Sequence, residues 1–167
     1  MQTGSVFDFS VSYKPKNNPD LEFTIRPFQI GEASNIAHFT AKVFAEREPL
    51  SLYVNQTYEM LYPFFLFLAL DAIKYKNGLL AIDKKTGEIA SVLFFYDMFY
   101  DYSSARRIAE QTSKGFKETE DKISSGLFSF SIKSGKYHYR PRRSCEKINI
   151  TYTATGDKYV GLGLMTR

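Results

Sequence analysis

The segment DKYVGLGLMTR, residues 157–167, decides how the rest of the sequence is interpreted. It follows the alternating run KINITYT, residues 147–153, which is typical of a β-strand. Two glycines in a G-x-G pattern then lead into an apolar, helix-capable tail. Glycines let the backbone approach a phosphate, and N–H groups at the start of a helix point toward it, although any tight strand-to-helix turn can carry the same pattern. We therefore predict a phosphate-binding loop, called the cradle below, which consists of Lys158, Tyr159, Val160, Gly161, Leu162, Gly163 and Leu164.

Length and composition indicate one ordinary globular domain. The chain has 167 residues, of which 44% are hydrophobic and 24% charged, so it can bury a sizeable core. Its net charge of +4 favours anionic ligands in general but does not identify a particular one. The single cysteine, Cys145, excludes an internal disulfide framework and favours a reducing compartment, so we expect a cytoplasmic protein.

We expect no targeting segment and no membrane attachment. The first twenty residues, MQTGSVFDFSVSYKPKNNPD, lack a basic region followed by an apolar core, and their KPKNNPD portion is typical of a polar, turn-rich lead-in. The most apolar run, Leu61–Leu70, contains Pro63 and meets Asp71, whereas a membrane span needs about 20 residues. We interpret this run as part of a buried helix.

The hydrophobic patterns predict the element order β-α-α-β-β, then an insertion, a strand and the start of a helix. The first helix should end before Pro49, because proline lacks an N–H and its ring clashes with the preceding turn. Two apolar runs flank a polar turn that contains Gly87, which is typical of a β-hairpin. The predicted elements before the insertion are a strand at 23–26, helices at 31–48 and about 55–76, and hairpin strands at 78–83 and 89–96.

We divide the chain into an N-terminal extension, residues 1–21, and one domain, residues 22–167, with an insertion at about 98–146. Residues 104–125 of the insertion are polar, with sparse apolar positions at Ile108, Phe116 and Ile123, and predict a solvated helix or a mobile segment. The fold class is α/β (α+β), with a mixed, mostly antiparallel sheet flanked by helices.

This order, closed by a strand that runs into K-x-x-G-x-G, resembles the GNAT superfamily of N-acetyltransferases. Their acetyl-CoA motif is R/Q-x-x-G-x-G/A, and Lys158 to Gly163 match it except that lysine replaces the planar arginine or glutamine. The resemblance covers roughly residues 22–167. It implies that the cradle backbone binds the pyrophosphate of acetyl-CoA, the co-substrate.

A second stretch, FAEREPL at residues 44–50, looks like the F-x-x-D/E-E-P-L pattern of insect arylalkylamine and dopamine N-acetyltransferases. In that branch the glutamate before the proline is the general base toward the amine, so the resemblance implies this role for Glu48. Arg47 departs from the pattern, because it stands where the pattern has an acid. The alternative interpretation is that Glu46 and Glu48 are solvated acids at a helix end.

In the family, a further strand, another helix and two last strands follow the cradle helix, with the group that protonates the leaving thiolate. We therefore expect an incomplete fold that ends at the start of the pyrophosphate helix, either the first part of a longer protein or a fragment completed by other protein chains. The resemblance implies an acetyl-CoA-dependent N-acetyltransferase acting on a small amine. The alternative is a non-catalytic GNAT-like structural or interaction subunit of a larger assembly.

Two further site types receive less support. Residues 133–143, KSGKYHYRPRR, mix basic and tyrosine side chains, which could stack bases and contact the phosphates of a nucleic acid. We favour a solvated loop, or one that contacts the phosphates of coenzyme A, and expect no nucleic-acid partner. No His, Cys and Asp set has metal-ligand spacing, so we expect no metal.

Overall fold

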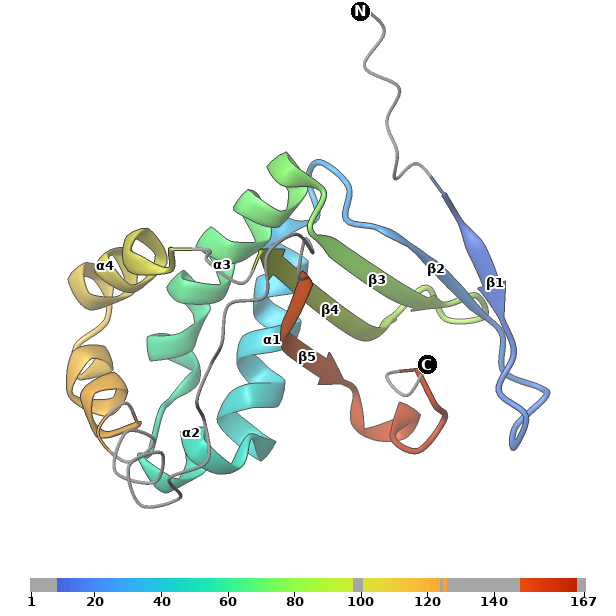
Figure 1. Cartoon of the computed structure of the whole chain (residues 1–167). Helices are drawn as coiled ribbons and strands as arrows, with labels where there is room; N and C mark the ends of the chain where they lie inside the picture. Colours follow the sequence, from blue (N-terminus) through green and yellow to red (C-terminus); the bar gives the residue numbers. More distant parts are fainter. Residues whose placement is uncertain (1–8, 98–100, 124, 126–147, 165–167) are drawn as a thin grey trace, which may run out of the picture.

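Figure 1 shows the computed structural model of the chain, which describes residues 9–97, 101–123, 125 and 148–164. Five strands form one sheet in the order β1-β2-β3-β4-β5. Every neighbouring pair is antiparallel, so the described sheet is wholly antiparallel and not mixed as predicted. The strands are β1 (Val11–Tyr13), β2 (Phe23–Pro27), β3 (Gly78–Asp83), β4 (Ile89–Asp97) and β5 (Ile148–Thr155).

The two long helices cover one face of the sheet (Figure 1). Ile36 of α1 and Phe65 and Leu68 of α3 are buried against Leu80 and Phe94 of the sheet, because the apolar stripe of each helix faces inward. The helices are α1 (Ala33–Arg47), α2 (Pro49–Tyr53), α3 (Tyr58–Tyr75) and α4 (Ser103–Thr112), with a 3₁₀ turn η1 (Asp157–Tyr159). The predicted strands from residue 23 onward and both predicted helices are confirmed, with shifted ends.

Prolines shape the helical layer. Pro49 ends α1, as predicted, and then serves as the first residue of the short helix α2, where a missing N–H has no cost. Pro63 lies inside α3 and cannot donate to the carbonyl of Glu59 one turn earlier. The hydroxyl of Ser113 donates to that carbonyl at 2.7 Å, so the group left without its helical partner is satisfied.

The hairpin of β3 and β4 is confirmed, and it carries two glycines with different roles. Gly87, in the turn, has φ 73°, a conformation that other residues rarely adopt. Gly78 begins β3 directly against the ring of Phe28, where any Cβ would overlap the ring. The ring of Phe28 packs in turn edge-on against Phe94, at 5.2 Å between centroids.

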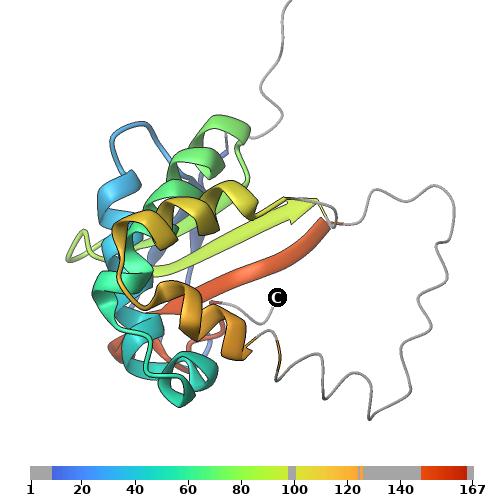
Figure 2. The ribbon, with the colours of Figure 1, turned by 90° about the vertical axis from the view of Figure 1, so that its left-hand side faces the viewer.

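The described part of the predicted insertion is helical and largely exposed on one side, in agreement with the first of the two predicted alternatives, but its other side contributes to the core. Ala105 and Ala109 of α4 are buried, and so is Phe116 in the helical segment 116–123. The sequence did not predict this burial, because alanines such as Ala105 and Ala109 carry little hydrophobic signal. In Figure 2, α4 lies on the outer side of α3.

The other face of the sheet carries a second, smaller core. Phe23, Ala81, Ala90 and Tyr159 are buried there, and Tyr13, Leu21, Leu162 and Leu164 pack around them. The cradle therefore packs against this face of the sheet, together with Tyr13 and Leu21 of the N-terminal segment. Strand β1, which was not predicted, pairs with β2 through Val11–Ile25 and Tyr13–Phe23.

None of the helices in the described part of the chain combines the length and the apolar character needed to cross a membrane.

Candidate functional site

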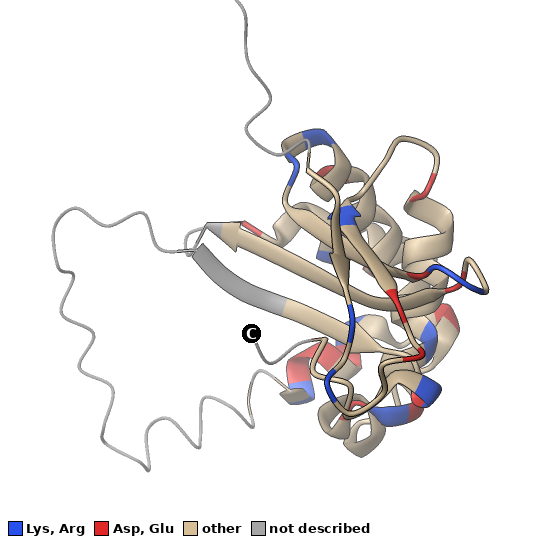
Figure 3. Cartoon of the chain, turned by 90° about the vertical axis from the view of Figure 1, so that its right-hand side faces the viewer, with Lys and Arg blue, Asp and Glu red and all other residues tan. Residues whose placement is uncertain are grey.

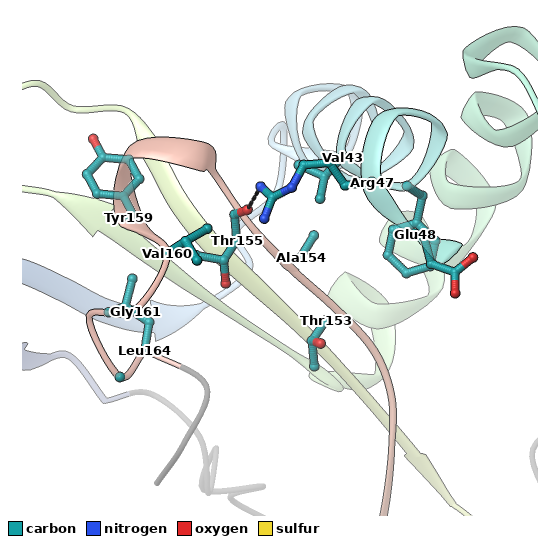
Figure 4. Close-up of a pocket in the computed structure, with 12 residues that line it drawn as sticks. Val43, Arg47, Glu48, Thr153, Ala154, Thr155, Tyr159, Val160, Gly161 and Leu164 are labelled. Atoms are coloured by element: carbon teal, nitrogen blue, oxygen red, sulfur yellow. Dashed lines mark hydrogen bonds between the residues drawn. The ribbon is translucent and has the colours of Figure 1, made fainter. Parts of the chain in front are cut away.

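A cavity of about 380 Å³ lies between the C-terminal end of α1, the outer edge of β5 and the cradle (Figure 4). It brings together Glu48 and the cradle glycines, which the sequence assigned to a site from separate segments. The wall also includes Val43, Phe44 and Arg47 from α1, Thr153, Ala154 and Thr155 from β5, and Tyr159, Val160, Gly161, Gly163 and Leu164 from the cradle.

The outer edge of β5 offers backbone groups to the cavity. Within the described residues β5 is the last strand of the sheet, so its outer edge has no partner strand. The carbonyl of Thr155 faces this edge and accepts a hydrogen bond from Arg47 Nη1 at 2.9 Å, whereas that of Ala154 accepts one from Ser91 Oγ at 2.8 Å. Because backbone groups of alternate residues face the same edge, Thr153 presents its N–H and C=O to the cavity.

A bulge interrupts β5 just before these residues. Phe94 pairs with Tyr152 while Phe95 pairs with Ile150, which leaves Thr151 as the extra residue. Bulges of this kind bend a strand and are frequent beside active sites.

The cradle has the glycine conformations that an anion site needs. Gly161 and Gly163 have φ of 81° and 74°, and a Cβ at Gly161 would meet no protein atom within 4 Å. Their N–H groups donate no hydrogen bond within the part of the chain that the structure describes. The donors and the open space fit a phosphate group.

The predicted start of a helix is not an α-helix in the described residues. Residues 157–159 form a single 3₁₀ turn, and residues 160–164 continue as turns and bends. Two glycines with positive φ interrupt a helix here, and a helix this short is marginal without packing. The cradle therefore offers free N–H groups without the dipole of a long helix.

Lys158 and Tyr159 fasten the cradle to the turn between β3 and β4. Lys158 forms an ion pair with Glu88, so the cation that was predicted to meet a phosphate already has an acidic partner. The hydroxyl of Tyr159 donates to Asp83 Oδ2 at 2.9 Å and lies 3.3 Å from Glu88 Oε2. Figure 3 marks the positions of the acidic and basic residues along the ribbon, where the two signs of charge are interspersed.

These contacts shift the acid–base properties of the carboxylates. Burial alone would raise the pKa of Asp83, but hydrogen bonds from the N–H of Lys85, the hydroxyl of Tyr159 and the N–H of Thr86 outweigh it and hold the pKa below the usual value of an aspartate. The hydrogen bond from Lys158 lowers the pKa of Glu88, and the same contact raises the pKa of Lys158.

The N-terminal segment also holds the cradle, which sequence reasoning did not predict. Tyr13 Oη donates to the carbonyl of Leu162 at 3.0 Å, and Asn17 Nδ2 donates to the carbonyl of Gly161 at 3.2 Å. Nothing in the sequence signals these pairs, because tyrosine and asparagine are common and their partners are backbone atoms.

Glu48 lines the cavity and also has a structural role. Its Oε2 accepts a hydrogen bond from the N–H of Ser51 at 2.5 Å and so caps α2. In Figure 4 its carboxylate lies at the far end of the cavity from the cradle. Glu46, the alternative acid, is exposed and is not part of the cavity wall.

Arg47 crosses from the end of α1 to the segment after β5. Its Nη1 donates to Asp157 Oδ1 at 2.5 Å as well as to the carbonyl of Thr155. The residue that departs from the insect pattern therefore links the helix to the strand that leads into the cradle.

A second cavity, of about 590 Å³, lies beside α1, and His38 and Lys158 are among its lining residues. His38 Nδ1 is 3.0 Å from the hydroxyl of Tyr58. Among the described residues, no group of three or more His, Cys, Asp or Glu side chains is placed to hold a metal ion. Cys145 and the basic stretch 133–143 lie outside the described residues.

Solved structures share this fold, although the sequence matches no protein-family model and no curated protein. One is an insect protein assigned as arylalkylamine N-acetyltransferase 7, from the yellow fever mosquito, with a TM-score of 0.54 and 12% identity. Another is the C-terminal condensation domain of Ebony in complex with β-alanyl-dopamine, with a TM-score of 0.55 and 11% identity. The fold is GNAT-like. The matches cover 96% and 83% of this chain, which spans 68% and 61% of those two chains, respectively.

Proposed function

We propose that the protein binds acetyl-CoA through the cradle and transfers the acetyl group to a small amine. The main observation in support is that Glu48, the outer edge of β5 and the two cradle glycines line one cavity on a GNAT-like fold. One similar structure is assigned as an N-acetyltransferase, and the other contains an amide of a catecholamine. Both are consistent with amide formation from an amine.

The groups that line the cavity would have separate roles in binding and catalysis. The N–H groups of Gly161 and Gly163 would donate to the pyrophosphate, and the outward-facing backbone of Thr153 would pair with the amide groups of the extended arm. Acetyl-CoA, when bound, supplies a thioester that an amine can attack. Glu48 would accept the proton of the ammonium, directly or through a water molecule.

A second candidate, a non-catalytic GNAT-like subunit of a larger assembly, is favoured by two contacts. The carboxylate of Glu48 caps α2, and Lys158 is paired with Glu88. Both side chains therefore have structural partners, and these contacts account for their presence without a catalytic role. In this alternative, other protein chains would contact the surfaces around the cavity.

Two measurements on the full-length protein separate the candidates. Calorimetry with acetyl-CoA measures binding, and release of the coenzyme A thiol in the presence of a panel of small amines measures transfer. The enzyme is expected to show both binding and amine-dependent release. Binding without release would favour the non-catalytic candidate, and the absence of both would overturn the proposal that the cradle binds acetyl-CoA.

A further inference from the structure

The N-terminal segment contacts the cradle through residues that are not part of the cavity wall. Tyr13 lies in β1 and Asn17 in the loop that follows, and neither lines the cavity. Their side chains donate to two successive carbonyl groups of the cradle, those of Leu162 and Gly161. These contacts matter for any anionic ligand, because carbonyl oxygens that faced the cavity would repel it.

Because the peptide bond is planar, the hydrogen bond from Tyr13 to the carbonyl of Leu162 also orients the N–H of Gly163. The carbonyl of Leu162 and the N–H of Gly163 belong to one planar trans peptide, so they point in opposite directions. By holding the carbonyl on its own side, the hydroxyl of Tyr13 directs the N–H of Gly163 away from the N-terminal segment. Gly163 lines the cavity, so its N–H is directed toward that side of the cradle.

Such a constraint is needed because the peptide is flanked by a glycine. Gly163 has φ 74°, and glycine adopts positive and negative φ with similar ease, so the backbone alone does not select one orientation. The neighbouring peptide is held at both ends. The carbonyl of Gly161 accepts from Asn17, and the N–H of Leu162 donates to the carbonyl of Tyr159 at 3.4 Å.

Aromatic packing fixes the position of the Tyr13 hydroxyl. Its ring lies 6.5 Å from the ring of Phe23, and Phe23 packs edge-on against Tyr159 at 5.5 Å. Phe23 and Tyr159 are both buried in the second core, so this row of rings connects β1 to the cradle through fixed side chains.

We propose that Tyr13 is a positioning residue for the cradle. Its hydroxyl fixes the Leu162–Gly163 peptide so that the Gly163 N–H can donate to the diphosphate group of coenzyme A, and it thereby sets the affinity for that group. The inference rests on the proposed function for the identity of the ligand. The described part of the N-terminal segment, residues 9–21, contributes no residue to the cavity wall and is then part of the binding apparatus.

The test replaces Tyr13 by phenylalanine, which keeps the ring and removes the hydroxyl. We expect binding of both coenzyme A and inorganic diphosphate to weaken about two- to tenfold, the equivalent of one hydrogen bond. The change in the chemical shift of the Gly163 amide on addition of diphosphate should be smaller than in the wild type, while the urea midpoint falls by no more than the loss of one hydrogen bond causes. The control is Tyr75→Phe, at an exposed tyrosine that ends α3 away from the cradle, which should bind both ligands like the wild type.

Unchanged binding in Tyr13→Phe would overturn the inference. A loss of affinity that is explained entirely by lower stability, measured as the urea midpoint, would also overturn it. A wild-type protein that binds diphosphate but not coenzyme A would contradict the proposed function. The role of Tyr13 would then be decided by the affinity of the wild type and of Tyr13→Phe for diphosphate. A wild-type protein that binds neither would overturn both.

Discussion

The hydroxyl of Tyr159 donates a hydrogen bond to Asp83 Oδ2 at 2.9 Å and so joins the cradle to the turn between β3 and β4. Both side chains are buried, each with 3% of its surface exposed. The other carboxylate oxygen of Asp83 accepts from the N–H of Lys85 at 2.8 Å. One carboxylate therefore holds the hairpin turn and the cradle together.

This contact gives stability a pH dependence that the variant Tyr159→Phe should reveal. The hydroxyl helps to lower the folded-state pKa of Asp83, so its contribution is complete above about pH 4 and is lost as the pH falls through that lowered pKa. We expect the variant to be less stable by about 1–2 kcal/mol at pH 7, with a difference that shrinks in acid. Urea unfolding from pH 7 to pH 3 measures it, and a difference that stays constant with pH would contradict the coupling.

The variant Glu48→Gln separates a catalytic role from a capping role. Glutamine keeps an oxygen that can accept from the N–H of Ser51, so α2 should remain capped, but glutamine cannot accept a proton at neutral pH. We expect the rate of acetyl transfer to fall at least about a hundredfold, with loss of the limb of the pH profile that reports a base. The matched control is Glu46→Gln, which should leave the rate unchanged. An unaltered rate and pH profile in Glu48→Gln would assign the base elsewhere.

The variant Gly78→Ala should destabilise the hairpin without touching the cavity. A Cβ at this position would overlap the ring of Phe28, which is buried against Phe94, so the core must shift to admit it. We expect a loss of about 1–3 kcal/mol in the free energy of unfolding. The double variant Gly78→Ala with Phe28→Leu should lose less than the sum of the two single changes. A fully additive loss would show that the ring does not cause the effect.

The sequence correctly predicted the helices and strands whose apolar residues recur at a regular spacing or form continuous runs. The helices α1 and α3 carry apolar stripes, and β3 and β4 are apolar runs around a turn with Gly87. Strand β1 has only three residues, and α4 buries alanines, so neither stands out in a pattern of apolar residues. The covering of the second sheet face was missed for the same reason, since β1 contributes to it.

The candidate site was predictable only as separate pieces. The resemblance to a known family indicated Glu48 and the glycines of the cradle, and the structure places them around one cavity. The ion pair of Lys158 with Glu88 and the hydrogen bond from Tyr13 to Leu162 depend on strand register and on chain reversals. Those relationships are tertiary, and no local pattern in a single sequence contains them.

The central claim is that the cradle binds acetyl-CoA through the backbone of its glycines. The most direct test is calorimetry of the full-length protein with acetyl-CoA, using Gly161→Ala beside the matched control Gly31→Ala. Both glycines have positive φ, 81° and 93°, and a Cβ at either would meet no protein atom within 4 Å, so the backbone strain is shared and only the position differs.

Gly161→Ala should weaken binding at least about tenfold, because its methyl group enters the space beside the free N–H groups and impairs hydrogen bonds to a charged ligand. Gly31→Ala should bind like the wild type, and Lys158→Ala should lose less than Gly161→Ala, because Lys158 is already paired with Glu88. Equal affinity in Gly161→Ala and Gly31→Ala, or no binding by the wild-type protein, would contradict the claim.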